Sequence, residues 1–399
     1  MISTWNGKTE TDHIQIHEHY GPIVRIAPNE LSFASPNAAR EILAAGKGFH
    51  KTDFYGVFPP PENPDIFTET REAVHAVKKR YASNPYSMAS MQQLSGYIEE
   101  TERLLMSKLD GMCQARDQYC NLGDFLHYYA FDVLGEIAFS RKFGFIECGY
   151  DLEKAIKTID DMQWYDGIIG QIPEWDFMFR RNPLWNFIPF LSTSNFLITR
   201  MALEEMDKRK KYGSKEIDRK DLLSSLMGAH EKAPENFKEG DVFAVAHGAI
   251  FAGSDSTAST MQSFCHHVMR EPAIYKRIMQ EIDEATAAGK LSEMPQWSEV
   301  QALPYFQACL KEAMRVRPAV GLNITRLVPA EGAELDGHRF PGGTRVALNA
   351  WVLHRNEAVF GADAKIFRPE RWLEGDAKMM DRFMFQVSVC AYSCHIHGS

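Results

Sequence analysis

The chain has 399 residues, of which 45% are hydrophobic and 12% aromatic, so it can bury a large core. Its 44 basic and 53 acidic residues give a net charge of -9, which argues against a nucleic-acid-binding protein, since such proteins normally carry a basic face. The seven cysteines are scattered and lack zinc-type spacing, so neither a disulfide framework nor a zinc site is expected, and a reducing compartment is the default.

The N-terminal segment is polar. Residues 1–15 contain neither the apolar region of a signal peptide nor a membrane span. The longest apolar stretch, residues 242–253, is interrupted by His247 and is too short to cross a bilayer. As written, the chain is expected to be soluble and cytoplasmic.

The first half of the chain combines short extended segments with helices. Residues 23–27 and 30–34 predict a small hairpin around a Pro-Asn turn. Helical spacing and strong helix formers predict helices over residues 88–112 and 122–140. Between residues 160 and 200, prolines interrupt a segment rich in aromatic and aliphatic residues. This segment could form a lid over an apolar pocket, and a set of buried connections explains it equally well.

The second half contains a long central helix. Asp241 is its predicted N-cap, and the helix is expected to end near Pro272. A further helix is predicted over residues 304–316, and short extended segments follow residue 320. The overall prediction is a mainly α protein with a minor β-sheet, folded as a single domain over residues 1–386.

Polar residues interrupt the middle of the long helix, in the order Ala252, Gly253, Ser254, Asp255, Ser256, Thr257. Glycine, an acid and hydroxyl side chains are poor choices inside a helix, and the glycine alone costs up to about 1 kcal/mol. One interpretation is a local distortion where a ligand approaches the backbone, with the carboxylate and hydroxyl groups handling protons beside it. The alternatives are an ordinary kink and a loop mistaken for a helix.

Three further motifs are weak when each stands alone. Glu312 and Arg315 are spaced to pair on one helical face. Arg371, in FRPERW, offers a planar guanidinium group to a carboxylate such as that of Glu312. Residues 75–80 (HAVKKR) and Arg326 could supply cations to an anionic ligand. The ordinary alternatives are a surface ion pair, a proline-bounded loop and a solvated charged face.

In combination, these motifs resemble those of the cytochrome P-450 superfamily over nearly the whole chain. The pattern A-G-x-D-[S/T]-[S/T], then E-x-x-R, then F-x-P-E-R-[F/W], is highly specific in this order, with 57 residues from Asp255 to Glu312 and 59 from Glu312 to Arg371. The opening HEHYGPIVRIAPNELSF looks like that of fungal microsomal members. The segments KTDFYGVF, NPYSM and GQIPE look most like the pisatin demethylase-like branch.

The resemblance implies a proton relay on the long helix. In this family an acid and the hydroxyl that follows it relay protons to iron-bound dioxygen, and these positions are Asp255 and Ser256 here, with Thr257 adjacent. Most relatives have threonine at the position of Ser256; serine keeps the hydroxyl and loses the methyl group that restricts its rotamer. The residues that would face the haem and leave room for oxygen are Ala252 and Gly253.

The resemblance also implies structural and cofactor-binding residues. The family's buried Glu-Arg-Arg network, which braces the haem-binding side of the core, is matched by Glu312, Arg315 and Arg371. The positions that typically contact the haem propionates are occupied by His75, Lys79 and Arg326. Lys79 stands where arginine is commoner, so a bidentate contact would be lost.

Both ends of the chain depart from the family pattern. Relatives continue with a glycine-rich loop, F-G-x-G-x-R-x-C-x-G, and a helix under the haem, whereas residues 387–399 read VSVCAYSCHIHGS. Cys394 falls where an ungapped alignment places the iron ligand, but the residues before it do not match, and we expect that it does not ligate iron. The membrane anchor and the hinge of the family are also missing. The expected fold is therefore incomplete at both ends, with an aberrant tail over residues 387–399.

Two functional hypotheses follow. The first is a haem-dependent monooxygenase that inserts one oxygen atom of O2 into a hydrophobic small molecule of secondary metabolism or detoxification. It would use haem b and receive electrons from NADPH through a cytochrome reductase, on the cytosolic face of the endoplasmic reticulum membrane. The second is a non-catalytic remnant without stable haem, at most a partner-binding helical protein, and the missing loop favours it for the chain as written. An unrelated helical regulatory protein would leave the ordered motifs unexplained.

Overall fold

The computed structural model describes residues 1–58, 63–114, 119–180, 182, 197–212 and 219–385. They form two compact units, each with its own hydrophobic core. The first unit contains the described residues between 53 and 258, and the second contains residues 2–52 and those from 259 onward. The single domain expected over residues 1–386 stays a prediction.

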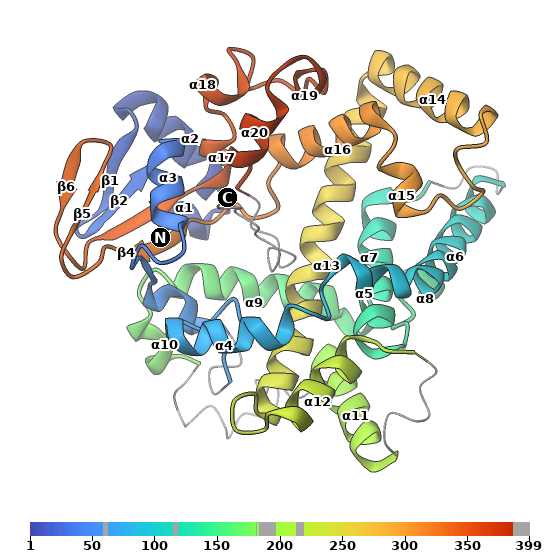
Figure 1. Ribbon diagram of the computed structural model, residues 1–399, viewed down its shortest axis with the longest axis horizontal. Helices are drawn as coiled ribbons and strands as arrows, with labels where there is room; N and C mark the ends of the chain where they lie inside the picture. The colour runs from blue at the N-terminus through green and yellow to red at the C-terminus, as the bar shows by residue number, and fades with distance from the viewer. Residues whose placement is uncertain (59–62, 115–118, 181, 183–196, 213–218, 386–399) are drawn as a thin grey trace. The chain divides into compact units, whose positions relative to one another are not determined.

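Helices dominate the first unit, as the hydrophobic periodicity predicts (Figure 1). They are two short 3-10 helices, Asp53–Val57 and Leu152–Lys154, and the α-helices α4 (Glu72–Ala82), α5 (Met88–Gln93), α6 (Ser95–Gln114), α7 (Leu122–Phe139), α8 (Phe145–Cys148), α9 (Ala155–Ile169), α10 (Glu174–Met178), α11 (Leu197–Tyr212), α12 (Leu222–Lys232) and the first part of α13 (Glu239–Arg270).

The predicted helix over residues 122–140 is confirmed as α7, which Asn121 caps by accepting the backbone N–H of Gly123 at 3.1 Å. The helix predicted over residues 88–112 is in fact two helices, α5 and α6, which meet at Leu94. Leu94 is only 3% exposed, so the break carries a buried apolar side chain, which helical spacing by itself does not reveal.

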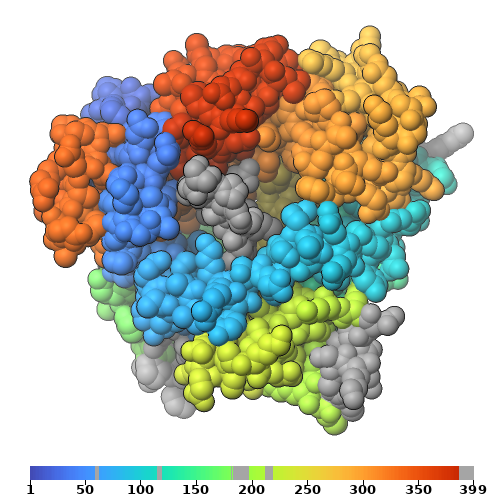
Figure 2. All heavy atoms as spheres, in the orientation of Figure 1, coloured from blue at the N-terminus to red at the C-terminus, as the bar shows by residue number. Residues whose placement is uncertain are grey.

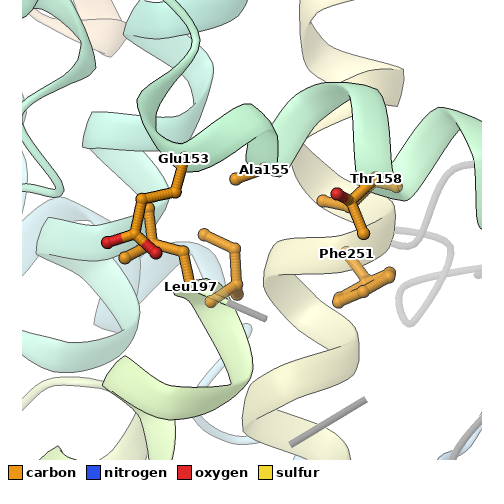
Figure 3. A pocket seen from close by; sticks show the side chains of 7 residues that line it. Glu153, Ala155, Thr158, Leu197 and Phe251 are labelled. Carbon is orange, nitrogen blue, oxygen red and sulfur yellow. The ribbon is translucent and has the colours of Figure 1, made fainter. Parts of the chain in front are cut away.

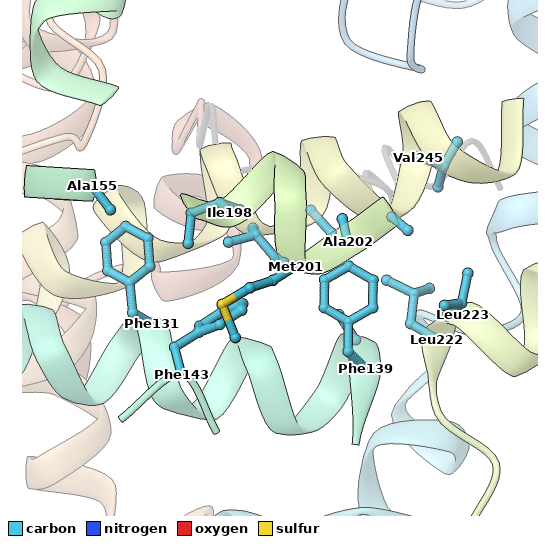
Figure 4. Packing of buried hydrophobic residues seen from close by; sticks show 14 of the residues in the cluster. Phe131, Phe139, Phe143, Ala155, Ile198, Met201, Ala202, Leu222, Leu223 and Val245 are labelled. Atoms are coloured by element: carbon cyan, nitrogen blue, oxygen red, sulfur yellow. The ribbon is translucent and has the colours of Figure 1, made fainter. Parts of the chain in front are cut away.

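The core of the first unit forms where α7 meets α11, α12 and α13 (Figure 4). Phe131 and Phe139 of α7 lie beside Met201 of α11, and Leu223 of α12 and Val245 of α13 complete this part of the cluster. Each fully buried side chain of this size contributes about 1.5–3 kcal/mol. The core therefore fixes α13 against α7 before any functional side chain is considered.

The start of α13 differs from the prediction. The helix begins at Glu239, so Asp241 is its third residue and not its N-cap. The carboxylate of Asp241 instead accepts the backbone N–H of Lys238 at 2.8 Å, which is the part that an acid plays in a capping box. The far end of the helix, at Arg270, agrees with the end predicted near Pro272.

The second unit contains the remaining helices and both sheets (Figure 1). The helices are α1 (Ile2–Trp5), α2 (Thr9–Tyr20), α3 (Pro36–Leu43), the end of α13, α14 (Pro272–Ala287), α15 (Trp297–Val300), α16 (Pro304–Val316), α17 (Ala350–Leu353), α18 (Glu357–Phe360), α19 (Arg371–Glu374) and α20 (Ala377–Phe383). The bounds of α16 are those that the sequence predicts.

The predicted hairpin and the extended segments after residue 320 join in one sheet. The five strands lie in the order β1-β2-β7-β4-β3, in which β2 and β7 are parallel and the other neighbours antiparallel. A separate hairpin is formed by β5 and β6. The strands are β1 (Ile23–Ala27), β2 (Glu30–Phe33), β3 (His50–Lys51), β4 (Ile324–Leu327), β5 (Ala333–Leu335), β6 (His338–Phe340) and β7 (Arg345–Leu348).

Within the described ranges, no helix is both long enough and apolar enough to span a membrane.

Candidate functional site

The polar stretch of α13 is accommodated without a break in the helix. The hydroxyl of Ser254 donates to the carbonyl of Ile250 at 2.7 Å, and that of Ser256 donates to the carbonyl of Ala252 at 2.9 Å. Such bonds to the carbonyl four residues earlier satisfy a hydroxyl inside a helix. The expected local distortion is therefore not observed, since α13 runs uninterrupted from Glu239 to Arg270.

Gly253 has a packing role in this helix. It is buried, and a Cβ at this position would lie 3.0 Å from Cδ1 of Leu134 on α7. Close approach of α7 and α13 therefore explains the glycine. Ala252 and Ser256 are half-buried, whereas Thr257 is exposed. The approach of a cofactor to Ala252 and Gly253 stays a prediction.

Both carboxylate oxygens of Asp255 are hydrogen-bonded. Nε2 of His127, on α7, lies 2.8 Å from Oδ1, and the side-chain amide of Gln163, on α9, donates to Oδ2 at 2.5 Å. The side chain of Asp255 is 23% exposed and that of His127 is 18% exposed. The acid of the motif is thus held by donors from two other helices, and it sits near the surface of the first unit.

A small cavity of about 60 Å³ lies one turn away from Asp255, at Phe251. Phe251 and Thr158 face the same space from α13 and α9, and Leu197 of α11 lies at its edge (Figure 3). The other lining residues are Glu153, Ala155, Ile159 and Ile198, so the wall is mostly apolar. Neither Asp255 nor Ser256 lines this cavity.

Two of the predicted propionate ligands, His75 and Lys79, are one turn apart on α4. Both side chains are half-buried, and α4 lies at the surface on the face shown in Figure 2, in pale blue. Nδ1 of His75 lies 3.8 Å from a carboxylate oxygen of Glu72. The intervening Lys78 is different, because it is buried and its ammonium group lies 2.9 Å from Asp241 and 3.4 Å from Glu69.

The third predicted propionate ligand, Arg326, lies on β4 in the second unit. Its Nη1 donates to the carbonyl of Thr325 at 2.9 Å. His75 and Lys79 belong to the first unit, so the joint binding of one anionic ligand by the three residues stays a prediction.

The carboxylate of Glu312 is the centre of a buried network in the second unit. Glu312 is 0% exposed and accepts two hydrogen bonds from Arg315, one from Nε at 2.8 Å and one from Nη2 at 2.7 Å. Nε of Arg371 donates to the same carboxylate at 3.0 Å, from 59 residues away along the chain. The backbone N–H of Arg368 and the indole N–H of Trp372 add two further bonds.

The two arginines of this network also bind backbone carbonyls. Arg315 donates to the carbonyls of His354, Ala364 and Ile366. Arg371 donates to those of Phe360, Asp363 and Ile366 and to the carboxylate of Asp363. Because each guanidinium group holds several loops at once, the structure brings Glu312, Arg315 and Arg371 together as a bracing element. Its service to a haem site stays a prediction.

The side chains of His75 and Lys79 on α4 would suit the propionates of a haem group, since both can donate hydrogen bonds to a carboxylate. The residue that would supply a thiolate to the iron, Cys394, lies outside the described residues. In the described part of the chain, no group of three or more His, Cys, Asp or Glu side chains is arranged to hold a metal ion. The described donors therefore suit the periphery of the group and leave its iron ligand open.

Sequence reasoning missed His127, Gln163 and Trp372. His127 and Gln163 lie 128 and 92 residues before Asp255, and no local spacing connects them to it. Residue type gave no signal either, because α7 also carries Asp124, Asp132 and Glu136. The motif that contains Trp372 is visible in the sequence, but the sequence does not show that its indole N–H binds Glu312.

Comparison with known proteins gives matches along nearly the whole chain. The family model described as "Cytochrome P450", written here cytochrome P-450, matches residues 3–386. The cytochrome P-450 monooxygenase cicH of Emericella nidulans is 34% identical over 379 residues, covering 93% of this chain and 75% of that protein. The cytochrome P-450 monooxygenase gsfF of Penicillium aethiopicum is 33% identical, covering 94% of this chain and 76% of that protein.

Among solved structures, a zebrafish cytochrome P-450 determined with progesterone superposes with a TM-score of 0.70. The match covers 92% of this chain and 84% of that chain, at 21% sequence identity. At this identity the likeness shows the fold, and it agrees with the predicted mainly helical architecture with small sheets.

Proposed function

Since the chain belongs to the cytochrome P-450 family, an enzyme family of haem-dependent monooxygenases, we propose that its substrate is a hydrophobic small molecule of fungal secondary metabolism or detoxification. The family implies a haem monooxygenase that acts on a small molecule with a redox partner. We propose in addition that an NADPH-cytochrome reductase is the electron donor.

The observation that supports monooxygenase chemistry is the position of Asp255 directly before Ser256 on α13, with its carboxylate held by His127 and Gln163. When bound, haem would supply the activation of oxygen and the transfer of one oxygen atom. The chain's own residues would hold and move protons. A carboxylate with two fixed donors keeps one orientation, and the adjacent hydroxyl can both donate and accept.

The preference for a hydrophobic substrate rests on the resemblance, because the cavity beside α13 is apolar but, at about 60 Å³, far smaller than a small-molecule site. Its apolar residues come from α9, α11 and α13, and they include Ile159, Ile198 and Phe251 (Figure 3). Ligand sites are mostly apolar with a few polar groups, and Thr158 supplies one here. The similarity to monooxygenases of Emericella nidulans and Penicillium aethiopicum supports a fungal monooxygenase, and secondary metabolism is part of the proposal. We place the working enzyme at the cytosolic face of the endoplasmic reticulum membrane, as the resemblance implies.

The test is a carbon monoxide difference spectrum of the reduced protein, expressed with a supply of haem. A thiolate-type Soret band supports the proposal, and product formation with NADPH, reductase and an apolar substrate panel extends it. Cys394→Ala and Cys390→Ala form a matched pair. Loss of the Soret band in Cys394→Ala, together with its retention in Cys390→Ala, would identify Cys394 as the iron ligand. A parent protein without such a band supports the alternative, a non-catalytic remnant.

A further inference from the structure

The carboxylate of Asp255 is held by side chains from two neighbouring helices of the first unit. His127 approaches Oδ1 from α7 at 2.8 Å, and Gln163 approaches Oδ2 from α9 at 2.5 Å. The ring of His127 also packs against Phe131, with 5.4 Å between centroids. The imidazole of His127 is therefore held on one side by the ring of Phe131 and on the other by the carboxylate of Asp255.

The hydrogen bond determines the form of the imidazole. A carboxylate is only an acceptor, so Nε2 of His127 carries the hydrogen that lies between it and Oδ1, whether the ring is neutral or cationic. In the neutral ring Nδ1 is then the acceptor. A His–carboxylate bond of this kind orients both partners. Gln163 supplies an uncharged amide donor, so it fixes the second oxygen without changing the charge of the cluster.

Other acids lie in the electrostatic surroundings of the pair. Asp160, on α9, has a pKa raised above its ordinary value, first by burial and then by the negative charge of Asp255, while His127 acts in the opposite direction. Asp161 and Asp151 raise this pKa further.

We propose that His127 is a positioning residue, which together with Gln163 holds the carboxylate of Asp255 in one orientation for proton transfer. The inference rests on the proposed function, because only a monooxygenase would need the carboxylate of Asp255 oriented for proton transfer. His127 is not among the residues that line the cavity at Phe251, so its replacement should act on turnover rather than on substrate binding.

The experiment compares two replacements of the same side chain. Gln at position 127 carries an amide N–H at a similar reach to Nε2 and cannot titrate, whereas Leu carries no donor. We expect His127→Leu to lower product formed per NADPH, and kcat, by about tenfold, with KM unchanged, because the carboxylate of Asp255 loses one of its two fixed donors. We expect His127→Gln to restore most of this loss. The matched control is His230→Gln on α12, whose ring Nδ1 contacts the carbonyl of Phe237.

A second measurement does not depend on haem or turnover. Urea unfolding of His127→Leu, Asp255→Ala and the double variant forms a double-mutant cycle. We expect the shift in the midpoint of the double variant to be smaller than the sum of the two single shifts, because either single change already removes the bond.

The outcomes separate the two proposals. Additive shifts in unfolding, or equal losses of turnover in His127→Gln and His127→Leu, overturn the positioning role of His127, even if the enzyme is active. Turnover in His127→Leu that equals the parent's also overturns it. A parent without a thiolate-type band or product defeats the proposed function, and in that case non-additive unfolding still shows that His127 holds Asp255.

Discussion

The indole N–H of Trp372 donates to Oε2 of Glu312 at 2.9 Å, and both side chains are buried, at 5% and 0% exposure. The tryptophan therefore belongs to the network that Glu312 forms with Arg315 and Arg371. The motif that contains Trp372 accepts phenylalanine or tryptophan at this position, but only tryptophan has a hydrogen to donate.

Trp372→Phe tests this bond. We expect a loss of about 1.5 kcal/mol in the free energy of unfolding, at the lower end for a bond to a charged group, because Glu312 keeps its other donors. Urea unfolding measures the change. Trp297→Phe is the control, since Trp297 is 51% exposed and should tolerate the change. An equal effect of the two substitutions would contradict the role of the indole N–H.

A pair of glycines tests the packing around α13. A Cβ at Gly248 would lie 2.3 Å from the carboxylate of Asp65, whereas a Cβ at Gly228, on α12, would meet nothing within 4 Å. We expect Gly248→Ala to destabilise the protein by about 1–3 kcal/mol through overpacking. Gly228→Ala should stabilise it by up to about 1 kcal/mol, because alanine is the better helix former. The measurement is the midpoint of thermal unfolding of both variants. A change of the midpoint in the same direction in both would refute the packing argument.

The stability of the protein should fall in mild acid because of buried histidines. Burial lowers the pKa of His247 from 6.5 to about 4. Between these values the unfolded chain binds a proton at His247 that the folded chain excludes, so stability is lost as pH falls from about 6.5 towards about 4. The loss at pH 5 is about 2 kcal/mol for this residue. His13 and His354, whose pKa values are lowered to about 4 and about 3, act in the same direction.

His247→Gln isolates this effect. Glutamine keeps a polar partner for the hydroxyl of Thr199, which lies 3.0 Å from Nε2 of His247, but it does not titrate. We expect the difference in unfolding free energy between pH 7 and pH 5 to shrink in this variant. The exposed His338, changed to Gln, is the control. An unchanged pH dependence in His247→Gln would show that another group is responsible.

Ser256→Ala tests the predicted proton relay. We expect less product per NADPH consumed, because the variant lacks the hydroxyl that follows Asp255, while the helix keeps its backbone bonds. The fall should be about tenfold, less than the roughly 10²–10⁴-fold of a full general acid or base, because the adjacent hydroxyl of Thr257 can replace part of the relay. Ser254→Ala is the matched control, since Ser254 is fully buried and bonded to the carbonyl of Ile250. Equal coupling in Ser256→Ala and the parent would remove Ser256 from the relay.

The sequence pattern predicted an element correctly where neighbouring residues determine its bounds. The bounds of α16, the extent of α7 and the N-terminal hairpin follow from helix formers, caps, prolines and turn residues within a few positions. The prediction failed where one residue type can play two local roles. Asp241 resembles an N-cap in isolation, yet the helix begins two residues earlier and the acid serves as its capping-box partner.

The order and spacing of the motifs along the sequence determined the family, the mainly helical fold and the candidate residues on α13, α16 and α19. Only the tertiary structure decided the partners of those residues. It joined the early hairpin to the later strands in one sheet, placed Arg371 on Glu312, and brought His127 and Gln163 to Asp255. The reason is that one-dimensional periodicity tells which face of an element is buried, whereas a hydrogen bond between helices depends on how their faces pack, and the packing is set by the whole core.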